Sequence, residues 1–328
     1  MRGMGSAAMD LYYRTVAAVS TVFRGQRGSA FLVGLLGVLR SLREKIGLSD
    51  FERLVEGHLR RVFPNADQTR IREILKEYWK RHQSSMVALF NNRRISPRDL
   101  DRYLVIEGRQ LLDSALEEGR GVMLLVPHFG DERSLHIFLG MAGYPVSVIS
   151  SRYMDAPPYV RKCRLLMGRK WNRVGFPDQD PRWMFQALRR GEILHIAPTG
   201  YGGPRGTWVS SFGVPVLASS APYRLQRSTG CRMLTALCRV LPGMRYEIIL
   251  QEFHPEPDGS DFSQRLFHRF EEAAMKWPGQ YEWKTLVIRH RESNTIARLG
   301  RIPRNEEELE RAAVPSDSDP DIVLMKQD

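Results

Sequence analysis

The sequence contains few cysteines and no cysteine motif. Three occur in 328 residues, and no CxxC pair joins them: Cys163, Cys231 and Cys238. Because no cluster of histidines and cysteines accompanies them, the sequence predicts neither a zinc site nor a disulfide framework, and it implies no cofactor. We expect reduced thiols, as in cytosolic proteins. The histidines His136, His195 and His254 lack a ligand-like grouping, so we expect them to be structural or surface residues.

Long apolar segments are also missing. The run GSAFLVGLLGVL, from Gly28 to Leu39, has twelve residues and lies between Arg27 and Arg40. A helix that spans a membrane needs roughly 20. This run therefore fits either a helix that lies in the membrane interface, with its arginines among lipid headgroups, or an ordinary core helix. The sequence also shows no secretory signal with a small-residue cleavage site.

Two well-known functional patterns are absent as well. No G-x-S-x-G nucleophile elbow occurs, so the sequence does not indicate a serine nucleophile. The loop Gly202-Gly203-Pro204-Arg205-Gly206 can form an anion-binding nest, but it lacks the spacing of a P-loop.

Positive charge is abundant and unevenly distributed. The chain has a formal charge of +12. Eight acids and two bases give residues 306–328 a charge of −6, so the remainder carries +18. A body this basic favours an anionic partner: nucleic acid, an anionic membrane surface or an acidic carrier protein. The absence of an aromatic-basic platform or zinc finger places nucleic acid last.

The first hundred residues show the periodicity of helices. One apolar stripe follows the capping pair Ser49-Asp50 and ends before Pro64. A second stripe extends over residues 71–90. We therefore predict a helical N-terminal region over residues 1–100. Part of it contacts the membrane interface if the apolar run of residues 28–39 is an interfacial helix.

The pattern changes after Asp101. Short apolar segments alternate with helical ones; the strand-like segments are YLVIEG, GVMLLVP, PVSVIS, EILHIA, CRMLTALCRV and MRYEIILQEF. This alternation predicts a layered α/β fold, a mostly parallel sheet flanked by helices, over residues 101–291. Residues 292–328 lose apolar periodicity and gain charge, which is typical of a mobile acidic tail.

A histidine stands where the run GVMLLVP ends. Functional sites in parallel sheets gather beyond the carboxyl ends of strands, and His128 lies at such an end. A neutral imidazole can take a proton from a hydroxyl, and a carboxylate on its other nitrogen fixes the tautomer. Asp131 and Glu132, three and four residues on, can both reach the ring if a helix begins here. The sequence does not choose between them.

Several ordered motifs resemble one enzyme family. The run VIEGRQLLDSALEEGRGVMLLVPHFGDE, the segment SSFGVP at residues 210–215 and WPGQYEW at residues 277–283 are similar to the bacterial lipid A biosynthesis acyltransferases, the late lauroyl and myristoyl transferases. These belong to the lysophospholipid-type acyltransferases, and their corresponding motifs are H-F-G-N-W-E, F-F-G-x-P and P-x-Q-Y-x-W. The resemblance extends from about Val105 to Arg291.

The chain departs from that family at two places. The family carries its acid five residues after the histidine, where this chain has Arg133. It also often has Asp-Gln where this chain has Pro198-Thr199-Gly200. The first departure requires Glu132 or Asp131 to replace the usual acid; otherwise the protein is a weakly active or inactive member that binds lipid or carrier.

The resemblance implies transfer of a fatty acyl chain from an acyl thioester to a hydroxyl or amine of a lipid or glycolipid. The donor would be acyl carrier protein or acyl-CoA, and His128 would be the base. We expect Arg152, Arg205 and Arg133 to contact substrate or carrier. The expected location is peripheral, at the cytoplasmic face of the inner membrane, without nucleic acid as a partner.

Overall fold

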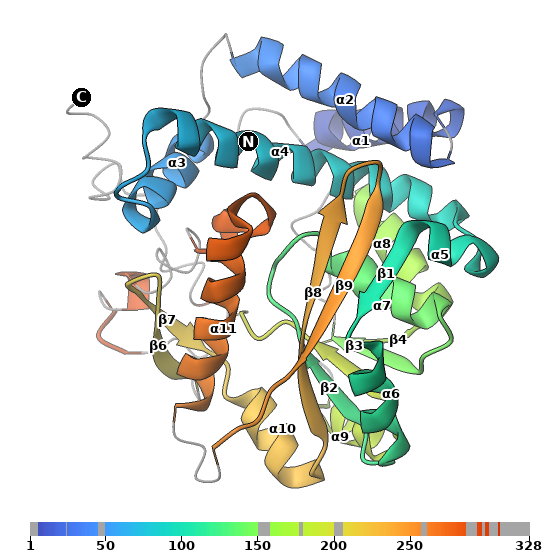
Figure 1. Cartoon of the computed structure of the whole chain (residues 1–328), viewed down its shortest axis with the longest axis vertical. Coiled ribbons are helices and arrows are strands. Elements are labelled where there is room, and N and C mark those ends of the chain that lie inside the picture. Colours follow the sequence, from blue (N-terminus) through green and yellow to red (C-terminus); the bar gives the residue numbers. More distant parts are fainter. Residues whose placement is uncertain are drawn as a thin grey trace.

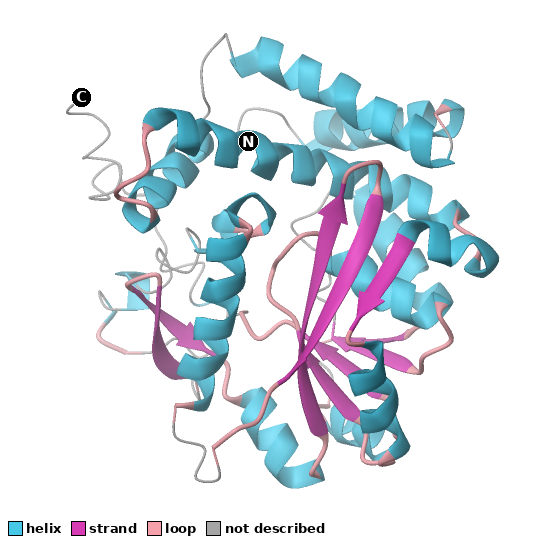
Figure 2. Cartoon of the chain, viewed as in Figure 1, coloured by secondary structure: helices cyan, strands magenta, loops and turns pink. Residues whose placement is uncertain are grey.

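A seven-stranded sheet organises the chain between residues 104 and 252 (Figures 1 and 2). The computed structural model describes residues 6–23, 25–44, 50–149, 158–176, 180–199, 206–256, 261–286, 294–296, 299–301 and 308. Strand order is β1, β9, β8, β2, β5, β3, β4. Every neighbouring pair is parallel except β8 and β9, which are antiparallel. The strands are β1 (Leu104–Glu107), β2 (Val122–Leu125), β3 (Val146–Ile149), β4 (Arg173–Gly175), β5 (Ile193–Ile196), β8 (Arg232–Leu241) and β9 (Arg245–Glu252).

Strand β2 is central because it is apolar on both faces. All four of its side chains are buried. Successive side chains of a strand point to opposite faces, so Val122 and Leu124 pack with α6 (Arg109–Glu117) and α7 (Glu132–Met141). Met123 and Leu125 pack on the other face. There they meet α9 (Arg182–Arg189), α10 (Ala221–Thr229) and α11 (Phe262–Lys276). The prediction of a layered α/β fold with a mostly parallel sheet is confirmed.

The N-terminal region is helical, as predicted. It comprises α1 (Ser6–Val22), α2 (Gly25–Glu44), α3 (Asp50–Val62) and α4 (Gln68–Asn91), at the top of Figure 1. Helix α4 lies between the sheet and α2, and its stripe Ile71, Ile74 and Tyr78 is buried against Phe129 and Trp283. Short helices link this region to β1: η1 (Asn92–Arg94), η2 (Pro97–Asp99) and α5 (Leu100–Tyr103).

A small hairpin, β6 (Thr207–Ser211) and β7 (Val214–Ala218), stands apart from the main sheet. Its two turn residues, Phe212 and Gly213, both have positive φ, as tight hairpin turns require. Helix α11 holds the hairpin, because the carboxylate of Glu271 accepts from the backbone N–H of Phe212 at 2.7 Å. The glycine of the SSFGVP segment thus has a conformational role.

Strand β4 and the two hairpin strands β6 and β7 were not predicted from the sequence. Strand β4 has three residues, of which only Gly175 is buried, so its local pattern is too short to recognise. The basic segment before it forms α8 (Pro158–Trp171). The predicted acidic tail lies almost wholly outside the described residues, and the division into three regions stays a prediction.

Two histidines are buried together between α7 and β5. The rings of His136 and of His195 on β5 lie 5.3 Å apart between centroids. Neither ring nitrogen of His195 has a hydrogen-bond partner among the described residues. Burial lowers the pKa of His195 to about 4, and burial together with His195 lowers the pKa of His136 to about 3. Both rings are therefore neutral in the folded protein at physiological pH.

This burial predicts acid sensitivity that one substitution should reduce. An unfolded histidine takes up its proton near pH 6.5, whereas folded His195 does so only near pH 4, so stability falls as pH drops below about 6.5. We expect His195→Leu to be stabilised relative to wild type by about 2 kcal/mol more at pH 5 than at pH 7. Urea denaturation at the two pH values measures this difference; parallel pH profiles for the two proteins would contradict it.

Candidate active site

The turn after β2 places His128 at the carboxyl end of the sheet. The N–H of Val126 still bonds to the carbonyl of Ile196 at 2.9 Å, and Pro127 then ends the strand pairing. Phe129 and Gly130 form isolated bridges to Tyr281 and Cys238. Gly130 has a φ of +59°, and a side chain there would place its Cβ 1.7 Å from the carbonyl oxygen of Cys238. This position therefore requires glycine.

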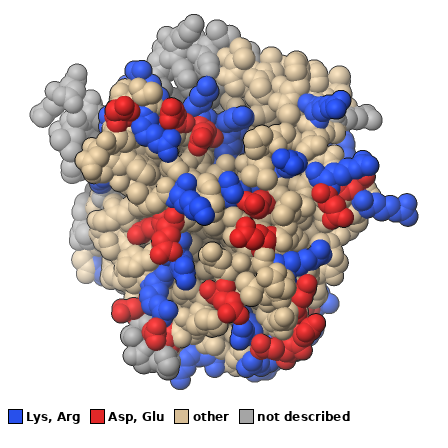
Figure 3. All heavy atoms as spheres, viewed as in Figure 1, with Lys and Arg blue, Asp and Glu red and all other residues tan. Residues whose placement is uncertain are grey.

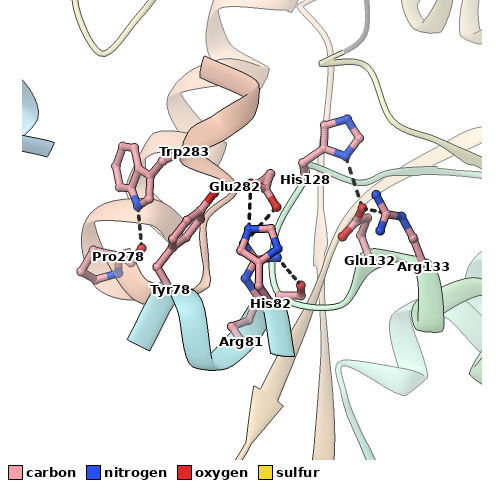
Figure 4. Close-up of polar contacts among 10 residues, drawn as sticks. Tyr78, Arg81, His82, His128, Glu132, Arg133, Pro278, Glu282 and Trp283 are labelled. Carbon is pink, nitrogen blue, oxygen red and sulfur yellow. Dashed lines mark hydrogen bonds and ion pairs between the residues drawn. The ribbon is translucent and has the colours of Figure 1, made fainter. Parts of the chain in front are cut away.

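Glu132 is the acid that lies beside His128. Its Oε1 is 3.5 Å from Nδ1 of the imidazole, and the two side chains are 14% and 31% exposed (Figure 4). Helix α7 begins at Glu132, so the carboxylate also lies at the positive end of a helix dipole. A carboxylate near Nδ1 favours the tautomer that keeps its proton there, which leaves Nε2 as the basic nitrogen. Such contacts are often long before substrate binds.

The charge of Glu132 is maintained by its neighbours. Burial opposes ionisation, but the guanidinium of Arg133, the ring of His128 and the charge of Arg81 outweigh it and lower the pKa of Glu132 to about 2. Nε of Arg133 lies 3.6 Å from Oε1 of Glu132. Arg133, which occupies the position of the expected family acid, therefore helps to keep the adjacent acid ionised.

Asp131 faces the interior instead. It is 3% exposed, and its Oδ2 accepts from Ser134 Oγ at 2.7 Å. The amide nitrogen of Asn92 donates in turn to Ser134 Oγ at 3.1 Å and to the hydroxyl of Tyr246 at 3.3 Å. Burial raises the pKa of Asp131 to about 6, although the Ser134 hydrogen bond opposes this shift. Of the two acids left open by the sequence, only Glu132 lies beside the imidazole.

Of the three arginines predicted to contact substrate or carrier, the structure describes one. Arg133 is 49% exposed next to Glu132. Arg152 and Arg205 lie outside the described residues.

Sequence reasoning missed a buried polar group next to the turn. Arg81 and Tyr78 on α4 both bond to the carboxylate of Glu282, at 2.9 and 2.6 Å, and Nε2 of His82 lies 3.2 Å from it. A signal for Arg81 was present: it continues the buried stripe of Ile71, Ile74 and Tyr78 at helical spacing. Glu282 lies within the WPGQYEW segment, but nothing local distinguishes it from an exposed acid.

A cavity of about 300 Å³ opens at the opposite end of the sheet, where β3, β4 and β5 begin. Tyr144, Trp171, Arg173 and Glu192 are among its lining residues, and it is separate from His128. Within the described ranges, no three histidine, cysteine or acidic residues cluster in a way that could hold a metal ion.

The conformation of Gly130 yields a stability prediction. We expect Gly130→Ala to destabilise the protein by about 2–5 kcal/mol, from left-handed strain and from overlap with the Cys238 carbonyl. Gly119→Ala is the matched control, because Gly119 has a similar positive φ of +72° but open space around it, and should cost about 1–2 kcal/mol. Thermal unfolding compares the two; equal losses would show that contact with Cys238 contributes nothing.

The chain matches the model of a known protein family. The model of the family described as bacterial lipid A biosynthesis acyltransferase matches residues 47–285, which include α3, α4 and the whole main sheet. No curated protein gives a significant match. The matched region covers well over half of the chain and contains the turn with His128 and Glu132 as well as Arg81 and Glu282. The chain belongs to the bacterial lipid A biosynthesis acyltransferase family, whose members transfer acyl groups to a lipid acceptor.

Proposed function

We propose that this protein transfers a fatty acyl chain from an acyl thioester to a hydroxyl or amine of a lipid or glycolipid, with His128 as the general base. The observation that carries this proposal is the contact between His128 Nδ1 and the ionised, partly buried Glu132 at the carboxyl end of β2. The arrangement resembles the base and orienting acid of other acyl-transfer enzymes.

The chemistry follows from the two side chains. Nε2 of His128 takes the proton of the acceptor while the acceptor oxygen or nitrogen attacks the thioester carbonyl. The carbon–sulfur bond breaks, and the leaving thiolate takes a proton from the imidazolium. Glu132 stays ionised throughout and stabilises the imidazolium, which suits its low pKa. General base catalysis of this kind contributes about 10²–10⁴-fold.

Basic residues suit the anionic substrates of this reaction. The donor is acyl carrier protein, which is acidic, or acyl-CoA, which carries phosphates, and the body of the chain has a charge of +18 outside residues 306–328. We propose that Arg133 contacts substrate next to the histidine, and that Arg152 and Arg205 bind donor or acceptor. Family membership favours a lipid A precursor as the acceptor.

We further propose that the protein binds the inner membrane peripherally, on its cytoplasmic face, through α2. Three apolar side chains of this helix, at helical spacing, are strongly exposed: Phe31 by 58%, Leu35 by 40% and Val38 by 59%. The surface over α2, at the upper right in Figure 3, is mostly uncharged, whereas basic and acidic side chains are interspersed below it. No helix in the described part of the chain has the length and apolar character needed to cross a bilayer. The family is membrane-associated, which agrees with such a contact.

One observation favours a second function, the binding of lipid or carrier without catalysis. Arg133 occupies the position of the expected family acid, as in a member that binds lipid or carrier without turnover. The position of Glu132 beside His128 favours the enzyme, and the next experiment separates the two.

Substitutions at the three candidate residues should have unequal effects on acyl transfer. We expect His128→Ala to lower kcat by about 10³-fold or more, because this variant lacks the basic nitrogen. We expect Glu132→Gln to lower kcat by about 10–100-fold, because the imidazole then lacks the charge that orients it. Asp131→Asn preserves the hydrogen bond to Ser134 and should change kcat by less than about threefold. Transfer from a labelled acyl-carrier-protein thioester into total bacterial lipid, followed by mass spectrometry, measures all three.

Far-UV circular dichroism controls for folding of each variant. Turnover retained by a folded His128→Ala protein would exclude the general base. Wild-type protein that binds lipid vesicles but transfers no acyl chain from either thioester would favour the binding function.

The membrane proposal predicts a loss of vesicle binding. Replacing Phe31, Leu35 and Val38 with serine should weaken partitioning onto vesicles of phosphatidylglycerol and phosphatidylethanolamine at least about tenfold, because about 2–4 kcal/mol of apolar burial is lost. Leu166→Ser on α8 is the control, since Leu166 is 61% exposed but lies on another helix. Co-sedimentation measures both; equal binding by the triple variant and wild type would exclude α2 as the contact.

A further inference from the structure

A buried arginine of the helical region lies next to the turn that carries His128. Arg81 is 4% exposed, and a buried guanidinium is unfavourable unless its charge and donors are satisfied. Its Nη2 donates to Oε2 of Glu282 at 2.9 Å, and its Nη1 donates to the carbonyl of Gly130 at 3.3 Å. The guanidinium also lies over the ring of Tyr78, 5.1 Å from its centre. One side chain therefore joins α4, the turn and the segment around residue 282.

Glu282 completes the connection through its own backbone. Its carboxylate accepts from Tyr78 and Arg81, and its N–H donates to the carbonyl of His128 at 2.9 Å. Although burial opposes ionisation, His82 and Arg81 hold the pKa of the Glu282 carboxyl well below its usual range. Figure 4 shows Arg81, His82 and Tyr78 grouped around Glu282 on one side of His128, with Glu132 on the other.

These contacts and the backbone of Phe129 form a closed ring. The ring passes from the His128 carbonyl to the Glu282 N–H, along Glu282 to its carboxylate, through Arg81 and back to the Gly130 carbonyl. The N–H of Gly130 is held as well, by the carbonyl of Gln280 at 2.7 Å. The backbone on both sides of Phe129 is therefore fixed, and with it the origin of the His128 side chain.

We propose that Arg81 and Glu282 are positioning residues, which hold the backbone of His128 so that its ring keeps the geometry needed beside Glu132. This inference rests on the proposed function of His128. Arg81 suits the role because its planar group reaches two acceptors at once, which a lysine ammonium on a single stem does poorly. A fold that needed only stability at this place could use apolar side chains, since buried ion pairs often add little to stability.

The chain contains a matched control. Glu192 is also a buried carboxylate paired with arginine: Arg190 Nε lies 2.7 Å and Arg173 Nη1 3.0 Å from its Oε1, and Ser147 Oγ donates to Oε2 at 2.7 Å. Glu192 lies at the opposite end of the sheet from His128, where β5 begins. Glu282→Gln and Glu192→Gln therefore each remove the charge of a buried carboxylate paired with arginine, but only the first change is next to the turn. The arginines that contact Glu192 are more exposed, at 43% and 67%, than Arg81 at 4%.

The kinetic test uses Glu282→Gln and Arg81→Lys, which retain most of the packing, with circular dichroism to verify folding. A labelled dodecanoyl thioester of acyl carrier protein is the donor, and total bacterial lipid is the acceptor. We expect kcat to fall about 10–100-fold with KM within about twofold of wild type, because a shift of about 1 Å in a catalytic group has such effects. Glu192→Gln should leave kcat unchanged.

A second measurement needs no substrate. Diethyl pyrocarbonate modifies neutral, accessible imidazoles, and peptide mass spectrometry gives the rate at His128 relative to that at His254, which is 65% exposed. A loosened turn exposes the ring of His128, so its relative rate should rise in Glu282→Gln and Arg81→Lys and should not change in Glu192→Gln.

The proposal requires both results. An unchanged rate at His128 overturns it whatever the kinetics, and so does an unchanged kcat in folded variants. An equal loss of kcat in Glu192→Gln shows a general effect of lost stability and also overturns it. If His128→Ala retains transfer, the general base fails, while the modification rate still reports whether Arg81 and Glu282 hold the turn.

Discussion

The site depends on a turn with no spare room around its backbone. Gly130 lies so close to the carbonyl of Cys238 on β8 that no side chain fits. The N–H of Asp131 bonds to that same carbonyl, at 2.9 Å, and the N–H of Gly130 bonds to Gln280. The chain leaving β2 is thus attached to its neighbours before α7 begins. This attachment determines where α7 starts, and the start of α7 determines which acid meets His128.

Two adjacent carboxyl groups have opposite environments as a result. Glu132 belongs to the first turn of α7 and lies near Arg133 and Arg81, which help to lower its pKa to about 2. Asp131, one residue earlier, is enclosed with Ser134, and burial raises its pKa to about 6. Environments that separate the pKa values of neighbouring acids are typical of functional sites. Here the separation supports the orienting role proposed for Glu132 and a structural role for Asp131.

The N-terminal helical region packs on the sheet and also contacts the turn that carries His128. Helix α2 presents an apolar face to the outside, and α4 lies beneath it and supplies Arg81 to the turn. The surface proposed to meet lipid and the residue proposed to position the base are therefore on packed helices of the same region. Apolar side chains of α3, α4 and the segment after α11 form one buried cluster with Phe129, and Trp283 is fully buried within it.

Much of the fold could be predicted from local pattern. Local pattern includes the apolar run of β2, the helical stripe of α4 and the glycines that end the helices. A strand buried on both faces is apolar throughout, and a helix buried on one face shows apolar residues at helical spacing. Strand β4 escaped prediction because a segment of three residues, whose only buried member is Gly175, carries no period. The antiparallel pairing of β8 with β9 likewise depends on contacts between strands and not on either strand alone.

The sequence by itself determined that a histidine follows a buried strand with two acids close behind it, and its ordered motifs indicated the acyltransferase family. Only the tertiary structure decided between Asp131 and Glu132, since that choice depends on the residue at which α7 begins. It also decided that Arg81 is buried and paired with Glu282, 201 residues away. Helical periodicity tells which face of a helix is covered, but the partner that makes a buried charge tolerable comes from a distant part of the chain.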